Sequence, residues 1–100
     1  MIKPGVSIAG LRPEVVFGLA ELREVCREFK APFVVTSGTD GKHGTGSLHY
    51  VGLAADLRRT DDPLRPGLPE KMLSAFKQAL GAEFDVVLEK DHFHCEFQPK

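Results

Sequence analysis

Two histidines near the C-terminus, His92 and His94, have a type and spacing that suggest chemistry. If residues 92–97 form a strand, successive side chains alternate between its two faces. His92, His94 and Glu96 then share one face, while the apolar residues between them point into the core. Two imidazoles and a carboxylate displayed together are suited to binding a transition-metal ion. By itself, the pattern also fits the exposed polar face of an edge strand.

A second pair of potential metal ligands, His49 and Asp56, lies seven positions apart in the chain. In an extended strand they would be roughly 23 Å apart, and in a helix about 10 Å apart along the axis. Neither separation lets both side chains bind one ion at about 2 Å. A shared metal therefore requires the chain to double back between them, and Gly52 is where a sharp bend costs least.

The same segment resembles the signature Ser-x-His-x-x-Gly-x-Ala-x-Asp of the hedgehog/D-Ala-D-Ala metallopeptidase superfamily. The chain has the specified residue at each of the five positions, namely Ser47, His49, Gly52, Ala54 and Asp56. The superfamily includes zinc D-Ala-D-Ala carboxypeptidases and dipeptidases, and phage L-Ala-D-Glu endolysins. Its second motif, an acidic residue three positions before a final ligand histidine, is similar to Asp91-His92-Phe93-His94. The resemblance covers roughly residues 13–97.

What the resemblance implies is a zinc site with a fourth position open to water, as in catalytic zinc sites. The implied ligands of the Zn2+ ion are His49, Asp56 and His94. Asp91 occupies the general-base position, and His92 that of a histidine near the developing oxyanion. Ser47 and Tyr50 would line the substrate groove. Histidine and carboxylate ligands also suit other transition ions, so the identity of the metal stays open.

The chain departs from the superfamily pattern after its Ser-Gly pair, Ser37-Gly38. Many relatives have an aromatic residue and an arginine there, whereas this chain has Thr39 and Asp40. The identity of the base is also open, because strict alternation places Asp91 on the face opposite His92 unless the turn twists it round. Glu89 is the rival base.

The composition indicates one globular domain over residues 1–100, with 42% hydrophobic residues and a net charge of −1. This charge gives no basic surface for nucleic acid, and no apolar run reaches the roughly 18 residues that span a bilayer. The N-terminus lacks the apolar segment of a signal peptide. We therefore expect a monomer without nucleic-acid or membrane partners, made in the cytoplasm and acting on the cell wall after release or within a virion.

The elements that must position these residues follow from periodicity and from turn residues. Helices are expected at 13–29 and 69–80, and strands at 33–37, 53–57, 84–89 and 92–97, the last two joined by a tight Lys90-Asp91 turn. A glycine-rich loop separates the first two strands, and a polar connection runs from Arg58 to Gly67. Cys26 and Cys95 fit the apolar patterns as core residues. The expected fold is α+β, with two helices packed on a small, mainly antiparallel sheet, as the resemblance to the hedgehog/DD-peptidase group also implies.

The sequence supports two alternative hypotheses for the function. The first is a zinc-dependent carboxypeptidase or endopeptidase that cleaves bacterial peptidoglycan stem peptides, in phage lysis or in cell-wall remodelling. The second is a non-catalytic zinc-bearing structural or interaction module of a phage particle.

Overall fold

The computed structural model describes residues 2–38 and 52–98, which fold as helices on a sheet. Their elements are α1 (Pro13–Glu28), β1 (Val35–Ser37), β2 (Ala54–Arg58), α2 (Leu68–Leu80), β3 (Phe84–Leu88) and β4 (His92–Phe97). The α+β class and the order of elements are therefore confirmed, with boundaries that shift by one or two residues. The tight hairpin is confirmed too, because the Glu89 N–H donates to the His92 carbonyl at 2.8 Å.

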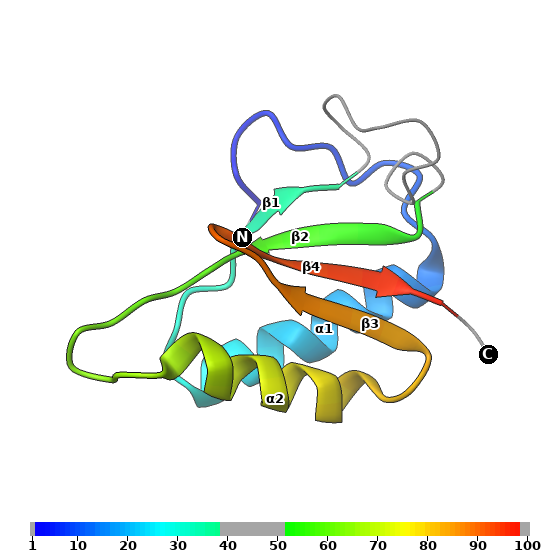
Figure 1. The fold of residues 1–100 in the computed structure, drawn as a ribbon. Helices are drawn as coiled ribbons and strands as arrows, with labels where there is room; N and C mark the ends of the chain where they lie inside the picture. Colours follow the sequence, from blue (N-terminus) through cyan, green and yellow to red (C-terminus); the bar gives the residue numbers. More distant parts are fainter. Residues whose placement is uncertain (1, 39–51, 99–100) are drawn as a thin grey trace.

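The strands form one antiparallel sheet in the order β1-β2-β4-β3 (Figure 1). β4 is thus an inner strand, which pairs with β2 on one side and with β3 on the other. Interpreting the His-x-His pattern as the polar face of an edge strand is therefore wrong. The register between β2 and β4 places Asp56 opposite His94, and Arg58 opposite His92.

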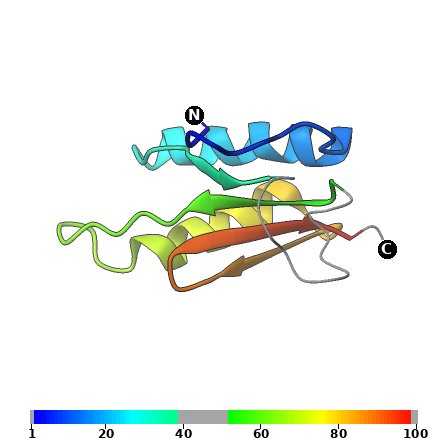
Figure 2. The same ribbon diagram turned by 90° about the horizontal axis from the view of Figure 1, so that it is seen from above.

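The hydrophobic core lies between the sheet and the two helices, which run beside it in Figures 1 and 2. Leu57, Phe93 and Cys95 contribute from the inner strands, and the Phe93 ring meets Phe76 of α2 edge-on, with ring centroids 4.9 Å apart. Cys26 and Cys95 are free, buried thiols, as expected. No helix within residues 2–38 and 52–98 is long and apolar enough to cross a membrane.

Gly52 lies just before β2 and has a backbone conformation that favours glycine, whereas the path from His49 to Gly52 lies outside the described residues. Its φ of +77° lies in the left-handed region. Its carbonyl accepts a hydrogen bond from the Arg12 N–H at 2.8 Å. A Cβ at this position would run into the Gly10 carbonyl, and a Cβ at Gly38 would run into that of Ser7. The N-terminal segment therefore packs closely against both glycines.

Candidate metal centre

Asp56, His92 and His94 form a cluster on the face of the sheet opposite the helices. Each offers one ligand atom, and these atoms all lie within 4.8 Å of one another. Asp56 Oδ1 is 2.8 Å from His94 Nδ1 and 3.8 Å from His92 Nε2. All three side chains are partly buried. Two of the expected ligands, Asp56 and His94, are therefore brought together although 38 positions separate them in the chain.

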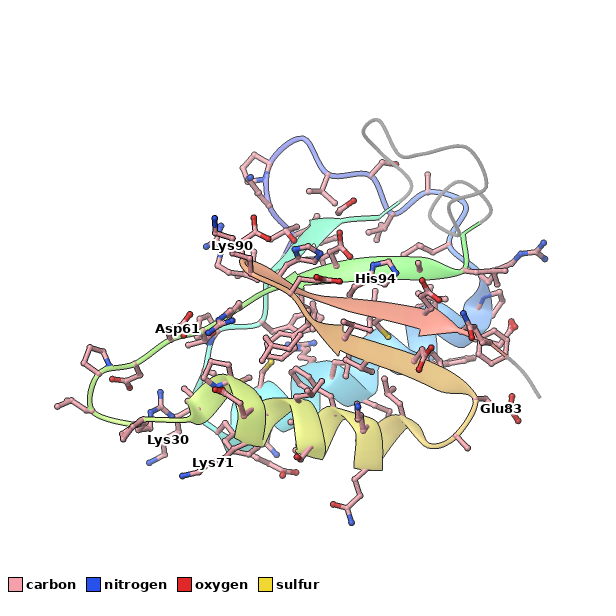
Figure 3. All side chains as sticks on the ribbon, viewed as in Figure 1. Lys30, Asp61, Lys71, Glu83, Lys90 and His94 are labelled. Carbon is pink, nitrogen blue, oxygen red and sulfur yellow. The ribbon has the colours of Figure 1, made fainter. Side chains whose placement is uncertain are left out.

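The β2–β4 register explains how this cluster forms. Asp56 and His94 are direct cross-strand partners, and His92 lies two residues along β4 on the same face. Their neighbours Leu57 and Phe93 point into the core, where both are buried. In Figure 3, the labelled His94 lies over the middle of the sheet, away from Lys71 on α2.

Each imidazole has a second carboxylate partner on its other ring nitrogen. His92 Nδ1 lies 2.6 Å from Asp91 Oδ1, and His94 Nε2 lies 2.7 Å from Glu96 Oε1. A metal-binding histidine commonly donates its outer N–H to a carboxylate, which fixes the tautomer and the ring orientation. With their other ring nitrogens held in this way, His92 and His94 would present Nε2 and Nδ1 to an ion beside Asp56. A set of two nitrogens and one oxygen fits a transition ion such as zinc.

The electrostatics of the cluster favour a positive charge between its carboxylates. The hydrogen bond to Asp56 raises the pKa of His94 to about 9, against an opposing effect of burial and with help from Glu96. Without an ion, the His94 imidazolium can therefore donate to Asp56 and Glu96 at once at neutral pH. A metal ion would take over the Asp56 side of this arrangement and displace a proton. The hydrogen bond from His92 lowers the pKa of Asp91.

The other expected site residues have different outcomes. His49, Ser47 and Tyr50 lie outside the described residues, as do Thr39 and Asp40. The hairpin turn brings Asp91 to the same side as the histidines, so the expectation from strict alternation does not hold at this position. Glu89 is exposed, and its backbone carbonyl accepts a hydrogen bond from Arg59 Nη1 at 3.2 Å.

His92 has a possible role that the resemblance did not imply. The resemblance put it near an oxyanion, and the structure also places it among the possible metal ligands. The alternation that put His92 and His94 on one face was the signal for this. What the alternation did not give was the distance of either ring from Asp56.

A pocket of about 350 Å³ opens beside the cluster. Asp56, Asp91 and His92 line it, together with Lys3, Thr36, Ser37 and Arg58. Lys3 was not singled out from the sequence, and Arg58 was assigned to the connection after the strand. Arg58 is instead the last residue of β2, on the same face as Asp56.

Comparisons with protein-family models, curated proteins and solved structures gave no match to this chain. Its function is therefore inferred from the geometry of the site and from the motifs in the sequence.

Proposed function

We propose that the chain is a zinc-dependent peptidase that cleaves a peptide bond in bacterial peptidoglycan stem peptides, as a carboxypeptidase or an endopeptidase. The observation that carries the proposal is the cluster of Asp56, His92 and His94 beside an open pocket, with a carboxylate behind each imidazole. The motif resemblance to the hedgehog/D-Ala-D-Ala metallopeptidases supports the same chemistry. Phage lysis and cell-wall remodelling are the settings that this activity suits.

In this proposal, Asp56 and His94 hold the ion, and either His49 or His92 completes the set of protein ligands. When bound, zinc lowers the pKa of a bound water to about 7 and polarises a carbonyl group. Glu96 keeps His94 in the tautomer that presents Nδ1, because it accepts the Nε2–H.

Asp91 is the proposed general base. Its carboxylate sits at the edge of the pocket, with Oδ1 on His92 and the side chain largely exposed. It would take the proton of the attacking water and return it to the departing amine. Where His49 is the third ligand, His92 is left to donate a hydrogen bond to the developing oxyanion.

The non-catalytic module remains the second candidate, and Asp91 is also the residue that favours it. Its hydrogen bond to His92 lowers its pKa, whereas a general base works best with a pKa near the working pH. In this alternative, Asp91 only orients the His92 ring, and the metal only stabilises the fold.

Zinc-loaded protein incubated with purified muropeptides tests the proposal, with release of D-Ala and cleavage of L-Ala-D-Glu followed separately. We expect the native chain to cleave one of these bonds. Asp91→Asn should keep its zinc and lose about 10²–10⁴-fold in rate, the usual contribution of a general base. The control is Asp85→Asn, which removes an exposed carboxylate on β3 outside the pocket.

Absence of cleavage of both bond types by the zinc-loaded chain would exclude the peptidase. A folded Asp91→Asn variant with the native cleavage rate would keep the peptidase but remove Asp91 as its base.

A further inference from the structure

The pocket beside the metal cluster is lined by two basic residues that come from distant parts of the chain. Arg58 lies two residues after Asp56 on the same face of β2, opposite His92 in the register. Lys3 comes from the N-terminal segment, where its N–H donates to the Val35 carbonyl at 2.9 Å. Ile2 forms a parallel bridge with the same residue. The backbone thus holds both basic residues at one pocket.

These two cations differ from the neighbouring arginines in their partners. Arg59 pairs with Asp61 at 2.9 Å, and Arg65 pairs with Asp62 at 2.8 Å. Within residues 2–38 and 52–98, no side-chain hydrogen bond or ion pair engages Lys3 or Arg58. The carboxylates that share their pocket, Asp56 and Asp91, are within hydrogen-bond distance of histidines.

Lys3 and Arg58 therefore offer two cationic partners to an anionic ligand. Lys3 and Arg58 balance the charges of Asp56 and Asp91, and a divalent ion on Asp56 would make the pocket net positive. The planar guanidinium of an arginine matches a carboxylate with two parallel hydrogen bonds. A lysine ammonium adds a compact charge with three donors.

We propose that Lys3 and Arg58 form a subsite for a carboxylate of the bound peptide. The inference rests on the proposed peptidase and narrows its substrates to peptides with a free carboxylate close to the bond that is cleaved. This carboxylate is a C-terminus or an acidic side chain, and both present the same two oxygens.

Binding of N-acetyl-D-alanyl-D-alanine and of its C-terminal amide to the metal-free protein, followed by NMR, tests the subsite. Metal-free protein is used because a carboxylate would otherwise bind the ion itself. We expect the acid to bind about tenfold more tightly than the amide, as for a hydrogen bond to a charged group. N-acetyl-D-alanyl-D-glutamic acid α-amide has its only carboxylate on the side chain, so its binding distinguishes an acidic side chain from a C-terminus.

Arg58→Gln and Lys3→Gln should each lower the affinity for the acid toward that for the amide. The matched controls are Arg23→Gln and Lys71→Gln, which remove exposed cations on α1 and α2 and should leave the preference intact. Arg58→Lys keeps the positive charge but loses the two parallel N–H donors of the guanidinium. This variant should bind the acid with intermediate affinity. The amide spectra report whether each variant is folded.

Equal binding of acid and amide by the native chain would overturn the subsite, and so would an unchanged preference in folded Arg58→Gln. Tighter binding of inorganic phosphate than of both carboxylate probes would overturn its assignment to carboxylates. A carboxylate preference that Arg58→Gln abolishes, without cleavage of any muropeptide, would keep the subsite and exclude the peptidase. Cleavage of a muropeptide by a chain that binds the acid and the amide equally would keep the peptidase and exclude the subsite.

Discussion

The two faces of the β2–β4 strand pair carry opposite kinds of chemistry on one backbone. On the helix side, Cys95 is buried among apolar side chains, and burial raises the pKa of its thiol to about 12. On the open side, its neighbour His94 has a pKa raised to about 9, chiefly by the hydrogen bond to Asp56. Both shifts are upward, yet one keeps a thiol neutral and the other keeps an imidazole charged. Alternation lets adjacent residues serve the core and the site separately.

Phe93→Ala should have the largest effect on the helix side. The side chain is 1% exposed and packs on Phe76, so its loss should lower the free energy of unfolding by about 3–5 kcal/mol. Urea denaturation measures this. Phe17→Ala, at a side chain that is 73% exposed, is the control and should change stability by less than about 0.5 kcal/mol. Equal losses in the two variants would contradict the assignment of the core.

Removal of a ligand should have the largest effect on the open side. Asp56→Asn and His94→Ala should each lower zinc affinity by about a hundredfold, since a few ligands share a binding free energy of about 10–16 kcal/mol. Competition with a chromophoric chelator measures this. Native affinity in either folded variant would rule the cluster out as the metal site.

His49→Ala and His92→Ala then separate the two proposed functions. A large loss in only one of them leaves three protein ligands and an open position, as in catalytic zinc sites. Equal large losses in both would give four protein ligands, which is the closed arrangement of a structural site.

A change in the shared backbone should affect both faces together. Gly52→Ala and Gly67→Ala both place a side chain at φ +77°, which costs about 1–2 kcal/mol. Only at Gly52 does the new Cβ meet backbone atoms, so this variant should lose more stability, and it should also lose zinc affinity. Thermal unfolding compares them. Equal destabilisation would mean that the contact with Gly10 does not constrain the bend.

Glu96→Gln tests the carboxylate behind His94. Outer partners of this kind typically contribute about 10- to 100-fold in metal affinity, and we expect a loss near tenfold because glutamine still accepts a hydrogen bond. The control is Asp85→Asn, across from Glu96 on β3. If Asp85→Asn lowered the zinc affinity as much as Glu96→Gln, the loss would reflect the removal of any nearby negative charge and not the hydrogen bond to His94.

The pH dependence should have opposite signs with and without the ion. The folded pKa of His94, about 9, lies above its ordinary 6.5, so its stabilising contribution is complete below pH 6.5 and lost as pH rises through about 9. Zinc needs the neutral ring, so its affinity should rise about tenfold from pH 7 to pH 8. Calorimetry in two buffers should detect about one proton released from His94 per ion at pH 7. Absence of proton release would show that His94 is not a ligand.

Local patterns in the sequence determined much of this protein. The helix periodicity and the placing of His92 and His94 on one face of a strand are confirmed, and Gly52 has the left-handed backbone that glycine favours. Each depends on residues close together in the chain, whose backbone preferences and alternation act within a few positions.

Only the tertiary structure decided that β2 lies between β1 and β4. The placing of β2 beside β4 sets Asp56 against His94 across 38 positions. The hydrogen bond of the Lys3 N–H to the Val35 carbonyl likewise brings Lys3 to the pocket of Arg58. These are pairings between distant segments, chosen by burial of the whole core, and a local pattern carries no record of which partner or register that burial selects.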